Sequence, residues 1–100
     1  MRSEMAKEAR FEFLAAVDWY DEARQGLGAE FVAEVEDAIA TIEDNPTFYA
    51  ELEDGIRRCL VNRFPYAILY SIETDHVLIL AVMHTSRRPG YWHGRPNFNF

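Results

Sequence analysis

The first half of the chain repeats its apolar residues at the spacing of α-helices. Over residues 4–24 they recur every three or four positions, which places them along one side of an amphipathic helix. A second stripe of the same spacing follows over residues 31–42. Gly26 and Gly28 tolerate the turn between the two helices, and Pro46 ends the second helix because it disfavours helical backbone at the residue before it. The pattern predicts an antiparallel helical hairpin.

In the second half the pattern changes to that of β-strands. Residues 56–64, 66–73 and 76–84 are rich in β-branched, aromatic and aliphatic side chains, and short turns separate them. Pro65 interrupts the first two runs because it has no N–H for a strand ladder. The predicted fold class is therefore α+β. We expect a helical hairpin packed on a three- to four-stranded antiparallel sheet, as a single domain over residues 1–100.

Two aromatic residues, Phe11 and Trp19, lie off the stripe of the first helix. We expect them to pack against the loop of residues 46–49; the alternative is a surface for a partner. The acidic residues of both helices also lie mainly off the stripes, and we expect them on a solvated outer face instead of at a metal site.

The charges are divided between the two halves of the chain. Residues 1–55 hold 15 Asp and Glu against 4 Lys and Arg, a net charge of −11. Residues 56–100 hold 2 against 6, a net charge of +4. Such segregation indicates a surface that meets an anion or an acidic protein segment.

The composition favours the cytoplasm as the location. The single cysteine, Cys59, cannot form an internal disulfide, which fits a reducing compartment. The longest apolar run, residues 77–83, is far shorter than the about 20 residues of a membrane span, so we expect no membrane partner. The N-terminus continues directly into an acidic helical pattern, and we expect no signal peptide.

The candidate binding residues are the six arginines of the second half and the aromatic residues beside the last of them. For Arg57, Arg58 and Arg63 an ion pair with the acids of residues 51–54 is the alternative to contact with a partner. The arginines after the last strand have few acids near them in sequence, and guanidinium binds carboxylates and phosphates alike. We expect these groups to converge on one water-accessible hollow. The predicted target- or antitoxin-binding set is Arg57, Arg58, Arg63, Arg87, Arg88, Tyr91, Trp92 and Arg95.

Cleavage of RNA through its own 2′-hydroxyl needs positive charge at the phosphate and a group that moves a proton. The catalytic candidates are His84, Arg87 and Tyr91. The aromatic residues Tyr66, Tyr91 and Trp92 either stack on bases or serve as core and hinge residues. His76 and His84 share a strand face, but eight residues at about 3.3 Å each separate them by about 26 Å. We expect neither a metal nor another cofactor.

Motifs spread through the chain together carry a resemblance. They are Trp19-Tyr20, Gly26-Leu27-Gly28, Asn45-Pro46, Gly55-Ile56-Arg57-Arg58, Arg63-Phe64-Pro65-Tyr66, Arg87-Arg88-Pro89, Tyr91-Trp92 and Arg95. In this order they resemble the RelE/ParE superfamily of toxins, most closely the members labelled plasmid stabilisation proteins. The resemblance implies a bacterial toxin of a type II toxin–antitoxin pair, held inactive by a cognate antitoxin. It implies ribosome-bound mRNA as the target of the RelE-like branch and DNA gyrase as that of the ParE-like branch.

Three features depart from the family. The family usually opens with a β-strand, but residues 1–3 alone precede the predicted helix, so this strand is short or missing. Its loss would leave an unpaired sheet edge, a site for homodimer formation or for addition of an antitoxin strand. The RelE-like ribonucleases have an arginine after the tyrosine that opens the second strand of the meander, where this chain has Ala67 after Tyr66. Family toxins are commonly basic, whereas this chain has a net charge of −7.

These features favour a ParE-like toxin that inhibits growth by binding a macromolecular target, with DNA gyrase as the candidate, and that cleaves no bond. The alternative is a RelE-like mRNA endonuclease, with Arg57, Arg58, Arg87 and Tyr91 around the phosphate and His84 as the proton carrier. A third hypothesis is a non-toxic family member that binds an antitoxin and nothing else, which a lost first strand would favour.

Overall fold

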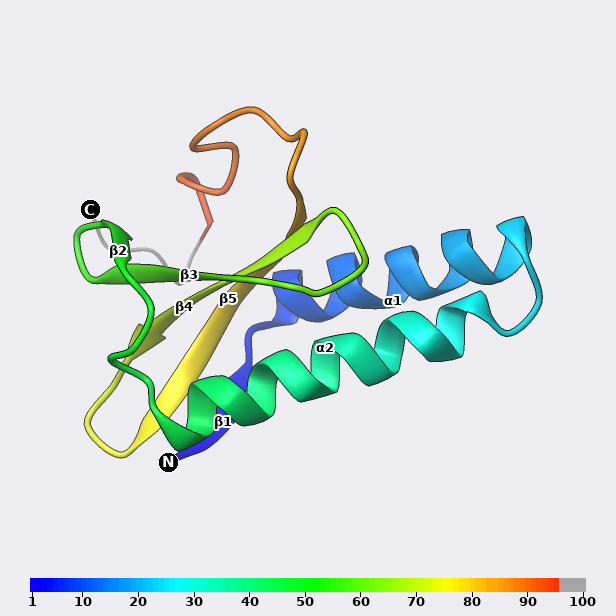
Figure 1. Cartoon of the computed structure of the whole chain (residues 1–100). Helices are drawn as coiled ribbons and strands as arrows, with labels where there is room; N and C mark the ends of the chain where they lie inside the picture. The colour runs from blue at the N-terminus through cyan, green and yellow to red at the C-terminus, as the bar shows by residue number, and fades with distance from the viewer. Residues whose placement is uncertain (96–100) are drawn as a thin grey trace.

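The computed structural model describes residues 1–95 and shows a helical hairpin beside a five-stranded sheet (Figure 1). The helices are α1 (Lys7–Ala23) and α2 (Leu27–Asp44). The strands are β1 (Arg2–Met5), β2 (Glu51–Glu53), β3 (Ile56–Leu60), β4 (Tyr66–Ile72) and β5 (His76–His84).

The strands follow the order β1-β5-β4-β3-β2 across the sheet. Strands β2 to β5 pair antiparallel with their neighbours, whereas β1 runs parallel to β5. The α+β fold, the helical hairpin and the antiparallel meander of β3, β4 and β5 are confirmed. The sheet differs from the prediction in two respects, because it has five strands instead of three or four and is mixed instead of antiparallel.

The first strand is present, whereas the sequence alone indicates a strand that is either short or missing. It is short and pairs with β5 as far as Met5, which lies opposite Ile79. Met5 is its one large apolar residue, so the helical periodicity that begins at residue 4 concealed the strand. The helix itself begins three residues later, at Lys7, after the backbone N–H of Ala6 has donated to the carbonyl of Ile79.

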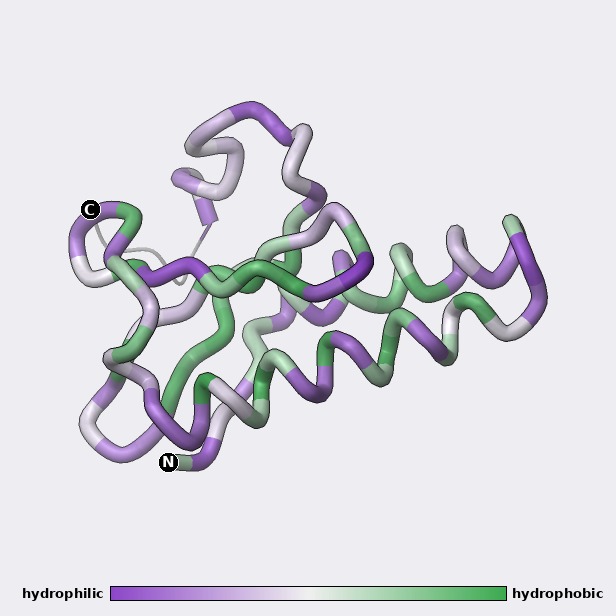
Figure 2. Tube along the Cα trace, in the orientation of Figure 1, coloured by the Kyte–Doolittle hydropathy of each residue, from purple (hydrophilic) through white to green (hydrophobic). Residues whose placement is uncertain are grey.

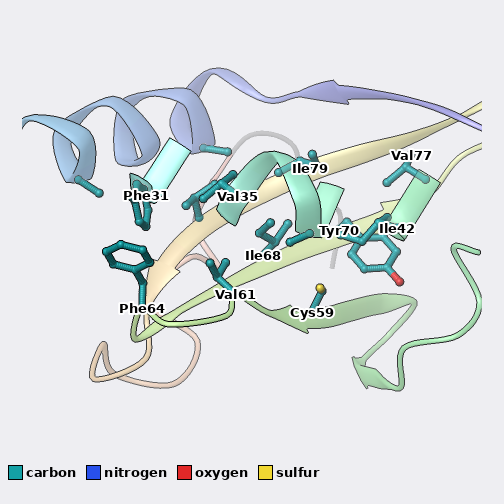
Figure 3. Packing of buried hydrophobic residues seen from close by; sticks show 14 of the residues in the cluster. Phe31, Val35, Ile42, Cys59, Val61, Phe64, Ile68, Tyr70, Val77 and Ile79 are labelled. Atoms are coloured by element: carbon teal, nitrogen blue, oxygen red, sulfur yellow. The ribbon is translucent and has the colours of Figure 1, made fainter. Parts of the chain in front are cut away.

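The helices cover one face of the sheet, and aromatic rings fill one end of the core between them. The ring of Phe31 lies 5.2 Å from that of Tyr20 and 5.2 Å from that of Phe64. Aliphatic side chains such as Ile42 and Ile68 continue the core toward the other end (Figure 3). Figure 2 shows the hydrophobic residues gathered on the strands and along the helices, with hydrophilic residues in the turns. Burial of this apolar surface is the main stabilising contribution to the fold.

The last described segment, residues 85–95, lies over the opposite face of the sheet and is called the C-terminal strap here. Figure 1 shows it in orange and red, on the side away from the helices. Its anchor is Trp92, which is 1% exposed and packs among Leu69, Leu80 and Ala81. Strand β5 is apolar on both faces, so the strap supplies the cover that its second face needs.

The two helices approach each other closely at their connection. The carboxylate of Asp21 accepts the backbone N–H groups of Gly26 (3.0 Å) and Gly28 (3.2 Å), which satisfies donors at the start of α2. A Cβ atom at Gly28 would lie 2.7 Å from the carbonyl oxygen of Val17. Because that oxygen belongs to the backbone of α1, it cannot move aside as a flexible side chain does, and the crossing requires glycine.

We expect Gly28→Ala to lower the free energy of unfolding by about 1–3 kcal/mol, because the clash outweighs the higher helix propensity of alanine, about 1 kcal/mol. Gly94→Ala is the matched control, since a Cβ atom there meets nothing within 4 Å. Urea unfolding of both variants measures the difference. Equal stability of the two would show that the helices separate without loss.

Candidate functional site

Two arginines of the second half are engaged by their own chain on the helix side of the sheet. The guanidinium of Arg57 donates to the carbonyl of Tyr49 and lies 3.7 Å from the carboxylate of Glu51. The guanidinium of Arg63 lies 2.7 Å from the carboxylate of Glu30. The acids that pair with them come from β2 and α2. Arg57 therefore makes the ion pair that was given as its alternative to contact with a partner, and Arg63 pairs with an acid of α2 instead.

Three other arginines, Arg58, Arg87 and Arg88, are exposed and make no ion pair within residues 1–95. The guanidinium of Arg87 lies over the ring of Tyr91, 4.2 Å from its centre. Arg58 stands opposite Leu69 in the sheet, which places it on the face that the strap partly covers. Guanidinium groups without an acid of their own remain available to an anionic partner.

The sixth arginine, Arg95, belongs to a cluster around one carboxylate of α1. Oε1 of Glu12 accepts from Nη1 of Arg95 (2.9 Å) and from the backbone N–H of Val82 (3.1 Å). Oε2 accepts from Nη2 of Arg95 (2.6 Å) and from the hydroxyl of Tyr91. The side chains of the pair are largely buried, so solvent screens their attraction little. Arg95 thus fastens the strap to α1.

The same cluster completes one edge of the sheet. Strand β1 accompanies β5 as far as Ile79, so the next outward backbone groups of β5 have no strand beside them. The N–H of Val82 donates to Glu12, and the carbonyl of Leu80 accepts from Nη1 of Arg95 at 3.2 Å. Side chains thus take the place of a strand. The unpaired edge that was expected to support a homodimer is occupied along this stretch.

The proton-transfer candidates Tyr91 and His84 both form hydrogen bonds with other groups of the chain. Burial raises the pKa of Tyr91 above its ordinary value, and the neighbouring carboxylate of Glu12 raises it further. The hydroxyl therefore stays protonated at neutral pH and donates to that carboxylate. Nδ1 of His84 accepts the backbone N–H of Ser86 at 3.0 Å, and the hydroxyl of Ser86 lies 2.7 Å from the same nitrogen.

The residues of the endonuclease hypothesis lie on two faces of the sheet. Arg57 and Arg58 are consecutive in β3, so their side chains point to opposite faces. The strap, which carries Arg87 and Tyr91, lies on the face of Arg58. Trp92 is buried, so it is a core residue, as one of the two alternatives expected, and in this arrangement it is not open to base stacking.

An apolar groove of about 530 Å³ lies between α1 and the end of β5. Trp19 stands at its side with 64% of its surface exposed, and Phe11 of the same helix is 65% exposed. The expectation that both pack against residues 46–49 is therefore wrong. In the sequence the groove is indicated by Ala15 and Trp19. They lie one helical turn apart, next to the buried apolar stripe of α1. The groove brings together two of the catalytic candidates, and its lining residues are Glu12, Ala15, Ala16, Trp19, Tyr20, Pro65, Tyr66, Val82, His84 and Arg87.

Metal binding, thiol chemistry and a membrane-spanning helix find little support in the part of the chain that the structure describes. Within residues 1–95 no three His, Cys, Asp or Glu side chains are placed to hold a metal ion. Burial raises the pKa of the Cys59 thiol, which keeps it in the weakly nucleophilic protonated form at neutral pH. No helix within this range combines the length and the apolar character needed to cross a membrane.

The Glu12 cluster generates a testable prediction. We expect Glu12→Gln to lower the free energy of unfolding by about 2–4 kcal/mol, because a mostly buried guanidinium loses its charged partner. Glu36→Gln is the matched control, since Glu36 is exposed on α2. In a Trp19→Phe background the fluorescence of Trp92 reports the strap alone. A red shift is expected with Glu12→Gln and none with Glu36→Gln; an unshifted spectrum in both would show that the strap is held by other contacts.

Comparisons with known proteins agree with this architecture. The family model described as "ParE toxin of type II toxin-antitoxin system, parDE" matches residues 4–89. Among solved structures the chain is similar to one described as "Chromosomal ParDE TA system from P. aeruginosa", with a TM-score of 0.74 and 15% identity over 84% of this chain and 95% of that chain. At this identity the likeness concerns the fold alone. No curated protein matches the chain in sequence. Because the family model spans most of the chain, this protein belongs to the ParE toxin family of type II toxin–antitoxin systems.

Proposed function

We propose that this chain is a toxin that stops bacterial growth by binding DNA gyrase, that it cleaves no bond, and that a cognate antitoxin neutralises it in the cytoplasm. Membership of the ParE family supports the choice of target. The observation that carries the binding role is the set of three exposed guanidinium groups, on Arg58, Arg87 and Arg88, that make no ion pair within residues 1–95. Such groups steer and hold an anionic protein surface.

The geometry argues against the endonuclease alternative. A ribonuclease needs its phosphate-binding and proton-transfer groups within hydrogen-bond reach of one phosphate. In this chain Arg57 is engaged on the helix side of the sheet, and the hydroxyl of Tyr91 donates to Glu12. Ala67 also stands where the RelE-like ribonucleases resemble one another in having arginine. The non-toxic alternative loses its main support, because β1 is present.

The first test of this proposal removes the two arginines of the strap. We expect induced expression of the wild type to arrest growth, and the purified protein to inhibit supercoiling by gyrase. Arg87→Ala with Arg88→Ala should weaken both effects at least about tenfold, since it removes two charges from the contact surface. Arg2→Ala with Arg24→Ala removes the same charge from two exposed surface ion pairs and should retain activity.

Full toxicity of the Arg87/Arg88 variant would contradict the proposed contact surface. Cuts in cellular transcripts, found by primer extension after induction, together with unaffected gyrase would favour the endonuclease instead.

We further propose that the apolar groove at Trp19 receives the antitoxin. An exposed tryptophan beside Tyr66 and Pro65 provides the aromatic anchor that dominates many interfaces. Arg87 lies at the same groove and would pair with a carboxylate of the bound segment. The fitting ligand is therefore an apolar antitoxin segment with an acidic residue at the position of Arg87.

Replacement of the anchor tests the groove. We expect Trp19→Glu to weaken binding of the antitoxin, taken as the protein encoded next to this gene, by about 100-fold, because a charge replaces a hot-spot ring. Phe48→Glu is the matched control, since Phe48 is 70% exposed and is not among the residues of the groove. Isothermal titration calorimetry measures both. An unchanged affinity with Trp19→Glu would place the antitoxin elsewhere on the toxin.

A further inference from the structure

The outer face of α1 is apolar at its centre, although nothing within residues 1–95 covers it. Phe11 is 65% exposed and Leu14 47% exposed, and Ala15 lies exposed next to them. The opposite side of the same helix, with Ala9 and Ala16, is buried against the core. A helix face that meets water is normally polar, so an apolar patch of this kind marks a contact with another surface.

Charges of opposite sign stand at the two ends of this face. Lys7 and Arg10 precede the apolar centre, and Asp18 and Glu22 follow it. All four are exposed and make no ion pair within the described residues. The partial charges of a helix favour acids in its first turn and bases in its last. Apart from Glu8 in the first turn, α1 has the reverse order, and its last turn has no basic residue.

The spacing of these charges is unfavourable within the helix as well. Asp18 and Glu22 are four residues apart and Lys7 and Arg10 three, so each like-charged pair lies on neighbouring turns and repels. None of the four has an opposite charge three or four residues away within the helix. These charges oppose the helix dipole and form no ion pairs within the helix. Their position therefore indicates that they stabilise a contact with another surface.

We propose that two copies of this chain form a dimer through α1, packed antiparallel across a two-fold axis that passes between Leu14 and Ala15. Lys7 of one copy then lies opposite Glu22 of the other, with both about 11 Å from the axis at 1.5 Å per residue. Asp18 of the second copy lies opposite Phe11, one residue or about 1.5 Å along the helix from the position opposite Arg10, within reach of its long side chain. Each contact occurs twice, because both copies use the same surface.

The order of the charges fits a second copy, because this face carries its own complement. A uniformly acidic partner is attracted by one end of the face and repelled by the other, and a uniformly basic partner meets the same conflict. Parallel packing of two copies places Lys7 against Lys7. Antiparallel packing matches all four charges and brings the large Leu14 against the small Ala15, which leaves room for it.

The dimer is expected to be weak. The 17 residues of α1 span about 25 Å, and one pair of helices buries less than the about 800 Å² per partner of a standard interface. Association in the micromolar range follows. Ala15 belongs both to this face and to the groove at Trp19, so the dimer interface borders that groove.

Charge exchange tests the arrangement. Sedimentation equilibrium of the wild type over about 5–200 µM should show a monomer–dimer equilibrium. Lys7→Glu with Arg10→Glu, and separately Asp18→Lys with Glu22→Lys, should each weaken dimer formation at least about tenfold, since like charges then face each other. An equimolar mixture of the two variants should associate again, because an acidic face meets a basic one. Circular dichroism verifies that both variants are folded.

Cross-linking tests the position of the axis independently of charge. Under oxidation Leu14→Cys should form a disulfide-linked dimer, because its two copies lie beside the axis. Glu22→Cys should not, because the two copies of that residue are about 22 Å apart. The wild type is the control for the native thiol, since Cys59 is buried.

Three results would overturn the proposal. They are a wild type that stays monomeric up to about 200 µM, a mixture of the charge variants that associates no more tightly than either variant alone, and cross-linking of Glu22→Cys as fast as that of Leu14→Cys.

Discussion

A single carboxylate joins the three parts of this molecule. Glu12 lies on α1, accepts the backbone N–H of Val82 in β5, and holds Arg95 and Tyr91 of the strap. An ion pair taken largely out of water is favourable when its remaining hydrogen-bonding capacity is satisfied, and here four donors surround the two oxygens. The helical layer, the sheet edge and the cover of the second sheet face therefore depend on one another through this group.

The division of charge along the sequence acquires a different meaning in the folded chain. Three arginines of the second half pair with acids of the first half, among them Arg95 with Glu12 and Arg63 with Glu30. The arginines without such a pair, on β3 and on the strap, are the fraction of the positive charge left for another molecule. A strongly acidic chain thus presents a local cationic surface, which suits the short-range contact with a protein target that we propose.

The sequence predicts the elements whose side chains repeat over many residues. The two helices and the strands β4 and β5 are long enough for their periodicity to exceed chance, and the turn at Pro65 follows from a missing N–H. Strands β1 and β2 have four and three residues with one large apolar residue each, so their existence depends on neighbours distant in sequence. Glu12 was equally hidden, because no local pattern distinguishes a carboxylate that meets Arg95 from one that meets water.

The strap has a consequence for chains that end early. A protein terminated shortly after His84 lacks Trp92, which covers the apolar sheet face away from the helices. It also lacks Arg95, whose guanidinium bonds the free backbone edge of β5. Such a molecule exposes an apolar sheet face and unpaired backbone groups at its edge. This combination is typical of aggregation-prone intermediates. Premature stop codons in this short region should therefore remove the protein through insolubility and proteolysis, instead of leaving a stable, inactive copy to occupy the antitoxin.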